Sequence, residues 1–535
     1  MKYLYSFITG LLLLGISASC SSDFLDTKSS ENVDQGQMFQ TTQGGMMAIN
    51  GVIRLMYTEE LSTTASRGGF ECLMIWFDML GEDLVYTLSN AQFMTSYQWT
   101  LHRNTTSGNV EHFYNLFYRF ISNSNMIIAN IDEAEGTQEE RNYIKGQAYA
   151  FRAFAHFNLV QMFGGRYRAG ENNSQLGVIM RTSNGTENLP RETVENVYAQ
   201  INEDLDEAIA LLSTITSITK PNKSHIDVNV ARGLKARVLL TQGRWAEAAD
   251  MAKLVVQNSG AKLQEDTYTT TINRFSDQSN TEWIWGKYAI DEQVKTLRDF
   301  HSYMSNKNAS YNKNSPRAIY NLLYNRISDT DVRKGIWFPR AQDMDYTPAP
   351  ILPTGGNRVN YTANKYLLAN ENNKSGDVPW MRLPEMMLIE AEGYARAGRY
   401  AEAAQALYPL ASFRDPEYTL STNTGEALID EIMFQRRVEL WGEGFRFLDL
   451  KRLDMALDRG PKPRTELGYS DDLWGSATAG KYMPENVDPE ASNFNMYDGS
   501  IREDCRTREA GHKDWQWSIP QSELDANPLC VQNPL

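Results

Sequence analysis

Residues 243–249 read GRWAEAA, and residues 398–404 read GRYAEAA. The two stretches differ only where one aromatic residue replaces another. Each follows an alanine-containing segment with helical periodicity, 230–241 or 385–397, and each opens a second such segment. Glycine permits a tight turn, the aromatic residue packs back on the first helix, and alanines let two helices approach closely. The repeat therefore predicts tetratricopeptide-like helical hairpins.

Further segments have the apolar spacing of amphipathic helices: 111–134, 138–163, 193–212 and 426–457, the last as one long helix or a helix pair. The segment 138–163 stops at Gly164-Gly165, a helix-terminating signal. Such hairpins bury their apolar faces only by stacking, so we expect these helices to pack on one another. The sequence thus places helical repeats mainly at 111–263 and 381–459.

Two other regions are irregular. Residues 264–380 are rich in Asn, Ser, Tyr, Gly and Pro, and they contain only short apolar runs. Residues 460–515 are the second irregular region. We expect both to form long loops with short strands and helices, draped over a helical scaffold. Together with the repeats they make a single body over residues 46–535.

The chain opens like an export leader. Lys2 precedes an apolar run at 3–16, small residues follow at 17–19, and Cys20 comes next. The run is shorter than the roughly 20 residues that a transmembrane helix needs, so it predicts a signal peptide over 1–19. A cysteine at this place is typical of a lipid attachment site, with 20–45 as anchor and tether. An ordinary secretory signal followed by an incidental cysteine is the alternative.

Composition limits the function classes. The formal net charge of −15 argues against nucleic acid as a partner, and 41% hydrophobic residues suffice for a substantial core. Besides Cys20 there are Cys72, Cys505 and Cys530, and no pair has the spacing of a zinc ribbon or a redox motif. Cys72 is expected to be a buried apolar side chain. Cys505 and Cys530 are either a disulfide or two separate thiols.

No catalytic motif of a serine hydrolase, zinc protease or P-loop enzyme occurs, and the six histidines have no paired ligand spacing. Asp329 and Asp331 precede Arg333, which we interpret as helix capping rather than as a metal site. No catalytic residue, metal or cofactor is therefore predicted. A carboxylate pair for glycoside hydrolysis is a spatial feature, so a surface hydrolase stays an alternative.

Six stretches, in this order along the chain, carry a family resemblance. They are Phe24-Leu25-Asp26 after the cysteine, 152–159 with Phe163-Gly164, 236–240, 382–392, 435–452 and 517–528. As an ordered set they resemble the SusD/RagB family of outer-membrane nutrient-binding lipoproteins of Bacteroidetes. The resemblance covers nearly the whole chain after the leader.

The resemblance implies a mostly α fold, in which about four tetratricopeptide-like hairpins support an irregular, loop-rich, ligand-facing region. It implies binding rather than catalysis. Such a protein captures a nutrient, an oligo- or polysaccharide or alternatively a peptide, and delivers it to a SusC-like TonB-dependent outer-membrane transporter. Cys20 would then hold the protein in outer-membrane lipid, facing the cell exterior. A protein-binding scaffold with no small ligand is a further alternative.

The resemblance also indicates where a ligand would bind. Neighbourhoods after Asp83 and in the irregular middle supply the predicted contacts, which are Tyr86, Asn90, Tyr303, Tyr311 and Asn312. Aromatic faces stack on pyranose rings, and polar side chains read the hydroxyl groups. Ordinary packing is the alternative for each tyrosine. The charged residues of the most specific stretch are instead expected to form a structural ion-pair network: Arg436, Arg437, Glu439, Arg446 and Asp449.

Overall fold

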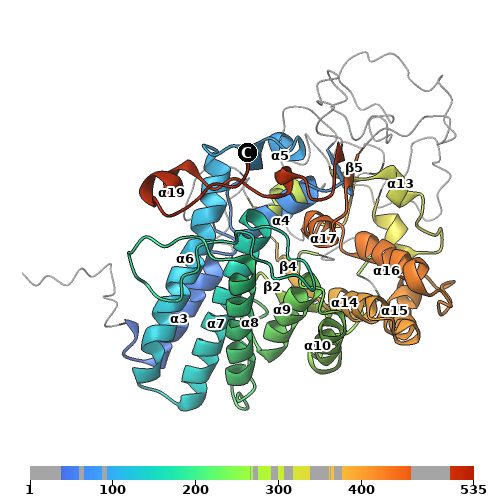
Figure 1. Ribbon diagram of the computed structural model, residues 1–535. Coiled ribbons are helices and arrows are strands. Elements are labelled where there is room, and N and C mark those ends of the chain that lie inside the picture. The colour runs from blue at the N-terminus through green and yellow to red at the C-terminus, as the bar shows by residue number, and fades with distance from the viewer. Residues whose placement is uncertain are drawn as a thin grey trace, which may run out of the picture.

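The computed structural model describes residues 38–58, 66–86, 93–265, 267–268, 275–290, 299–305, 317–337, 361, 363–366, 376–459 and 507–535. In these residues the protein is mostly helical, and its strands are short (Figure 1). The predicted fold class is confirmed.

The N-terminal helices are α3 (Thr42–Arg54), α6 (Gly108–Asn130), α7 (Gln138–Phe163) and α8 (Val194–Leu212). Helix α7 has the predicted bounds: Thr137 and Glu140 form a capping box at its start, and Gly164 follows its last residue. Helices α7 and α8 pack along their lengths, and α3 and α6 pack on the opposite side of α7.

The repeated heptapeptide forms two hairpins, α9 (Val228–Thr241) with α10 (Trp245–Asn258), and α14 (Leu383–Arg396) with α15 (Tyr400–Arg414). Gly243 and Gly398 have φ angles of +71° and +80°, so each turn uses the left-handed conformation that glycine tolerates. The hairpins stack through α10 and α14. Within the described residues α9/α10 and α14/α15 are hairpins, α6 packs on α7, and α8 packs on both α7 and α9, which confirms the prediction of stacked tetratricopeptide-like helices.

The segment predicted as one helix or a pair is a pair, α16 (Gly425–Glu439) and α17 (Arg446–Arg452). Helix α16 packs on α14 and α15, whereas α17 packs on α4 (Phe70–Met79). The turn between α16 and α17 therefore passes from the repeat stack to the irregular part of the body.

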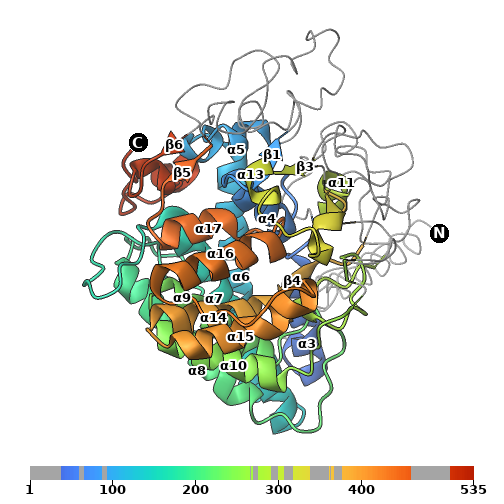
Figure 2. The ribbon, with the colours of Figure 1, turned by 90° about the vertical axis from the view of Figure 1, so that its right-hand side faces the viewer.

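Where the structure describes it, the irregular part contains three two-stranded antiparallel ribbons: β1 (Leu84–Tyr86) with β3 (Arg317–Ile319), β2 (Trp283–Gly286) with β4 (Pro379–Arg382), and β5 (Leu457–Asp458) with β6 (Thr507–Arg508). Its short helices include α5 (Met94–Tyr97), α11 (Phe300–Met304), α13 (Asn321–Tyr324), α19 (Gln521–Ala526), and the 3-10 turns η2 (Leu101–Arg103), η3 (Ile131–Glu133), η5 (Val332–Ile336) and η11 (Lys513–Trp515). Figure 2 shows β1, β3, α11 and α13 together on one side of the helical stack.

The C-terminal segment closes the core. Trp517 is fully buried, and its ring contacts Trp76, Phe113 and Phe163 from three different helices. Its backbone N–H donates to Met162 O at 2.9 Å. The end of the chain is thereby fixed to α4, α6 and α7. Of the described helices, none combines the length and the apolar character needed to cross a bilayer.

Candidate ligand-binding face

The β1/β3 ribbon brings two of the predicted ligand-contact neighbourhoods together. Tyr86 pairs with Arg317, and Leu84 pairs with Ile319. Because the strands are antiparallel, the chain leaves β1 after Tyr86 at the end of the ribbon where it enters β3 at Arg317. The neighbourhood of Asn90 and that of Tyr311 therefore connect to the same end of one ribbon.

Helix α11, which carries Tyr303, is attached beside that end. The guanidinium of Arg317 lies 5.9 Å from the centre of the Phe93 ring. The Phe93 ring stands perpendicular to that of Tyr303, with 5.0 Å between centroids. The hydroxyl of Tyr303 accepts a hydrogen bond from Ser66 N–H at 2.9 Å. Arg317, Phe93 and Tyr303 thus form a continuous contact from the ribbon to α11.

The base of the ribbon is bound to the α16–α17 region. Arg437 donates from Nε to both carboxylate oxygens of Asp83 at 3.0 Å. Trp441 Nε1 donates to the backbone oxygen of Asp83 at 2.9 Å, and Arg446 Nε donates to Glu82 at 2.9 Å. Two carboxylates thus face two guanidiniums, and the ribbon is held by side chains that belong to the scaffold.

A second ion cluster lies deeper. The Glu439 carboxylate lies 3.0 Å from Arg382, 3.1 Å from Arg414 and 3.3 Å from Arg333, and all four side chains are fully buried. Burial alone would raise the pKa of Glu439, but the three guanidiniums hold it well below its usual range. The cluster is charge-balanced within the described residues. Its cations are Arg333, Lys365, Arg382 and Arg414, and its anions are Glu282, Asp331, Glu439 and Glu443.

A third cluster joins α14, α16 and α17. Asp449 lies between Arg436 at 2.7 Å and Arg452 at 2.8 Å, and Arg452 also pairs with Glu392 at 2.7 Å. Burial raises the pKa of Asp449, whereas the two guanidiniums lower it. The net effect lowers this pKa to about 2. Every charged residue that the sequence assigned to a structural ion-pair network is therefore in one, which confirms that interpretation.

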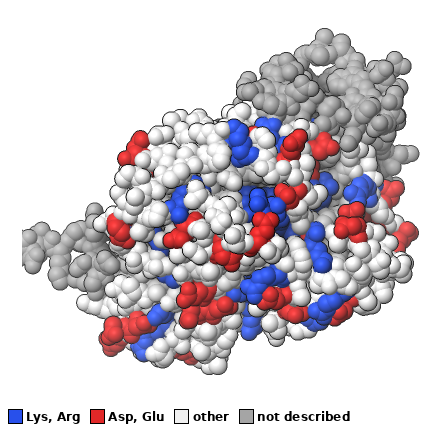
Figure 3. All heavy atoms as spheres, in the orientation of Figure 1, with Lys and Arg blue, Asp and Glu red and all other residues white. Residues whose placement is uncertain are grey.

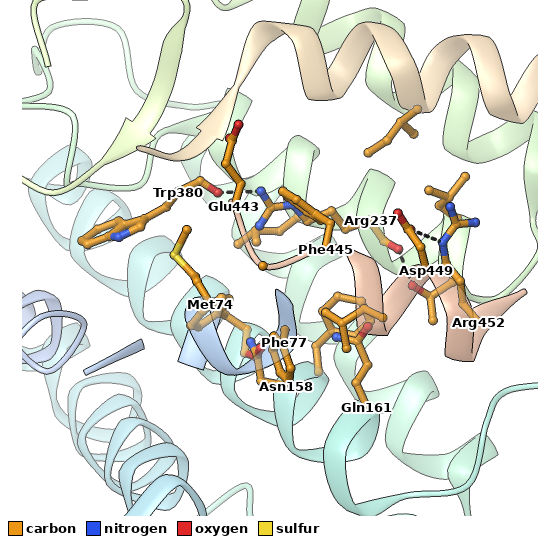
Figure 4. A pocket seen from close by; sticks show the side chains of 18 of the residues that line it. Met74, Phe77, Asn158, Gln161, Arg237, Trp380, Glu443, Phe445, Asp449 and Arg452 are labelled. Carbon is orange, nitrogen blue, oxygen red and sulfur yellow. Dashed lines mark hydrogen bonds and ion pairs between the residues drawn. The ribbon is translucent and has the colours of Figure 1, made fainter. Parts of the chain in front are cut away.

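A cavity of about 60 Å³ adjoins the third cluster, between α7, α9 and α17 (Figure 4). The Phe445 ring lies within 5.3 Å of the Arg237 guanidinium and 5.0 Å of that of Arg436. Arg237 also donates to Trp380 O at 2.6 Å and pairs with Glu385. Sites for small molecules usually measure about 300–1,000 Å³, so this hollow is too small for a sugar and belongs to the scaffold.

The predicted ligand contacts have different outcomes. Tyr86 is the last residue of β1, and Tyr303 lies in α11 with its side chain fully buried. In this conformation Tyr303 packs and offers no face to a ligand, so its direct contact with a ligand stays a prediction. Cys20, Asn90, Tyr311 and Asn312 lie outside the described residues.

Two smaller predictions concern Asp331 and the cysteines. The Asp331 carboxylate accepts from Arg333 N–H at 2.9 Å at the start of η5, which confirms its capping role. Cys72 is buried, as expected. Cys530 carries a free, buried thiol, and Cys505 lies outside the described residues.

Sequence reasoning missed the partners of the network. Arg333, Arg382 and Arg414 come from three segments, 106, 57 and 25 positions away from Glu439. Periodicity reports neighbours on one helix and contains no information on pairs at such separations. A usable signal was present all the same, because charged residues within otherwise apolar stretches require partners when they are buried.

Two protein-family models match the chain. One is described as starch-binding associating with the outer membrane and matches residues 23–240. The other is described as the SusD family and matches residues 340–535. No curated protein matches the chain in sequence.

Solved structures resemble nearly the whole chain. A SusD-like carbohydrate-binding protein from Bacteroides vulgatus is 25% identical with a TM-score of 0.73, covering 92% of this chain and 98% of that one. A SusD superfamily protein from Bacteroides thetaiotaomicron is 23% identical, with a TM-score of 0.71 and coverages of 92% and 100%. Surface glycan-binding protein A from Bacteroides thetaiotaomicron, in complex with laminarihexaose, shares the fold at 17% identity, with a TM-score of 0.64 and coverages of 92% and 99%.

Proposed function

Because this chain belongs to the SusD family, we propose that it is a cell-surface binding lipoprotein that captures an oligo- or polysaccharide. Lipid on Cys20 holds it in the outer membrane, facing the exterior. It delivers the glycan to a SusC-like TonB-dependent transporter and catalyses no reaction itself.

One observation supports a glycan as the ligand. The fold matches that of a surface glycan-binding protein whose structure holds laminarihexaose, and the match extends over nearly all of both chains. In that protein, the same fold thus binds a glycan.

The geometry supports a site at the end of the β1/β3 ribbon. Segments that carry the predicted contacts Tyr86, Asn90, Tyr311 and Asn312 connect there, and α11 with Tyr303 is attached beside it. The ribbon is held by ion pairs to α16 and α17. A site held in one geometry by its scaffold loses less conformational entropy when it binds.

The test is a titration of the purified protein, without its leader, against a panel of neutral oligosaccharides that includes laminarihexaose. We expect saturable binding, and at least about a fivefold loss of affinity in a Tyr86→Ala/Tyr311→Ala variant, since each lost stacking contact is worth about 0.5–1.5 kcal/mol. The matched control is Tyr408→Ala, because this tyrosine of α15 is 39% exposed and lies in the repeat stack. Tyr303 is buried and is left unchanged, and the melting temperature of each variant is measured as well.

The outcomes separate the alternatives. Unchanged affinity in the double variant would remove Tyr86 and Tyr311 from the site. Release of shorter saccharides by the purified protein would favour a hydrolase. Co-purification with a large barrel in the absence of any glycan affinity would favour a protein-binding scaffold. For the anchor, a Cys20→Ala variant should leave the membrane fraction of the cells.

A further inference from the structure

Two cavities lie on either side of residues 511–516. The first measures about 310 Å³ and is bounded by η2 and by residues around β6. The second measures about 90 Å³ and lies between the loop after α7 and the end of α17. The rings of Trp99 and Trp515 meet edge to face at 4.9 Å, with Trp99 lining the first cavity and Trp515 the second. The two hollows are thus neighbours across one pair of indole rings.

The charge of their walls differs from that of the whole chain. Over the face in Figure 3, acidic and basic side chains are interspersed, and the chain has a net charge of −15. The cavity walls instead hold six basic side chains, two side-chain carboxylates and the terminal carboxylate of Leu535. The basic residues are Arg103, Arg166, Arg168, Lys451, Arg508 and Lys513, and the acidic ones are Asp454 and Asp514.

The two side-chain carboxylates are already engaged. Asp514 lies 3.2 Å from Arg103 and 2.9 Å from Arg508, and Asp454 lies 2.8 Å from Arg166. Arg103 also donates to the backbone oxygens of Lys513, Gln516 and Pro534, and Arg168 pairs with Glu171 at 3.3 Å. Arg166 and Arg508 keep further donors, because a guanidinium has five N–H groups. Lys513, which is exposed, donates to the terminal carboxylate of Leu535. The walls therefore keep an excess of positive charge and of donors.

Lys451 provides the second cavity with a buried basic side chain. Its side chain is 7% exposed, and Nζ donates to Gln161 O at 2.5 Å and to Gly164 O at 3.0 Å, the carbonyls at the end of α7. No carboxylate pairs with it among the described residues. Burial without a counter-charge lowers the pKa of Lys451 to about 7. An anion in this cavity would stabilise the charged ammonium.

We propose that the two cavities form a binding site for an acidic saccharide, with uronate carboxylates contacting the basic side chains. The larger cavity has the size of a small-molecule site, for which about 300 Å³ is the lower end. The smaller cavity suits the carboxylate of a neighbouring sugar unit. This proposal rests on the proposed function and adds the class of glycan that is bound.

The experiment compares oligogalacturonate with the same oligosaccharide after its carboxyl groups have been reduced to alcohols. Binding to the wild-type protein is measured by calorimetry at low and at high salt. We expect the acidic form to bind at least about tenfold more tightly at low salt, and this difference to shrink as salt screens the charges. Binding should also tighten as the pH falls through 7, because a bound anion favours charged Lys451. The other titratable and charged groups of this cavity are Arg166, Arg168, Asp454 and His512.

The test variant is Arg166→Gln/Lys513→Gln, which removes one charge from each cavity without touching the core. The matched control is Lys253→Gln/Lys262→Gln, since both lysines are exposed and line neither cavity. We expect about a tenfold loss for the acidic form in the test variant only, because each substitution removes one charge-assisted contact. Vesicles with phosphatidylglycerol form a further arm and should not compete.

Equal affinity for the acidic and reduced oligosaccharides would overturn the proposal and leave glycan binding intact. An equal loss in the test and control variants would do the same, because it would reduce the effect to net charge. Displacement by the anionic vesicles would assign the cavities to lipid instead. Binding of neither form, with none for the neutral panel above, would overturn the proposal together with the proposed function.

Discussion

Arg437 and Asp83 lie 354 positions apart in the sequence, yet the guanidinium Nε of one is 3.0 Å from both carboxylate oxygens of the other. Arg437 belongs to α16, in the repeat stack, and Asp83 immediately precedes β1. The pair therefore connects the helical scaffold to the ribbon where the predicted ligand contacts meet.

Replacing Arg437 by Ala should destabilise the protein, because Asp83 would stay buried without its main partner. Loss of one partner from a buried ion pair costs about 3–5 kcal/mol, and Arg437 is 19% exposed, so we expect the lower end of this range. Urea denaturation measures the free energy of unfolding. Arg437→Lys keeps the charge but loses the two-pronged geometry and should fall between wild type and Arg437→Ala.

Glu439→Gln should be more severe. The amide keeps the shape of the side chain, but Arg333, Arg382 and Arg414 lose a shared negative charge inside the core. We expect a loss of about 3–5 kcal/mol in the free energy of unfolding. Glu402→Gln is the matched control, because this exposed glutamate pairs with Arg399 one turn away and such pairs are worth less than about 1 kcal/mol. Similar unfolding midpoints for the two variants would contradict the central role of the buried cluster.

The two repeat turns should respond differently to alanine. Both Gly243 and Gly398 have left-handed φ angles, and a side chain there costs about 1–2 kcal/mol. A Cβ on Gly398 would meet open space, whereas one on Gly243 would lie 2.8 Å from Ala169 Cβ. Thermal unfolding should therefore show a larger loss for Gly243→Ala than for Gly398→Ala. Adding Ala169→Gly to Gly243→Ala should remove the excess, once the effect of Ala169→Gly alone has been subtracted.

Stability should fall as the pH drops from 6.5 to 5. Burial lowers the pKa of five of the six histidines to about 3 or 4: His102, His112, His156, His225 and His301. Below pH 6.5 the unfolded chain binds protons at these imidazoles that the folded protein does not bind, so acid favours unfolding by up to about 1.4 kcal/mol per imidazole and pH unit.

Two buried carboxyls oppose this trend. Burial raises the pKa of Glu71 and of Asp78 to about 7, so the folded state binds protons there that the unfolded chain releases above about pH 4.5. Five imidazoles outweigh two carboxyls, and urea midpoints at pH 7, 6 and 5 should therefore decrease. His156→Gln should flatten the slope, whereas His512→Gln, at an exposed position, should not. A midpoint that rises toward pH 5 would contradict this balance.

Local patterns were sufficient for the helices and insufficient for the contacts between them. Helix α7 has its predicted bounds because its cap and its terminating glycine lie in the sequence next to it. The burial of Tyr303 was not predictable in this way. Its hydroxyl partner Ser66 lies 237 positions away, and its ring partner Phe93 belongs to a third segment. A tyrosine in an irregular stretch has the same local signature whether it packs or faces solvent.

The attachment of the β1/β3 ribbon has one more consequence. Asp83 and Arg317 are held by the scaffold and by Phe93, at the points where the chain enters the ribbon and returns to it. None of the buried ion pairs described above involves a residue of the stretches 87–92 or 306–316. The protein is therefore a suitable scaffold for engineering. Foreign loops grafted between Tyr86 and Phe93, or directly ahead of Arg317, would be attached at ends that the scaffold holds in place.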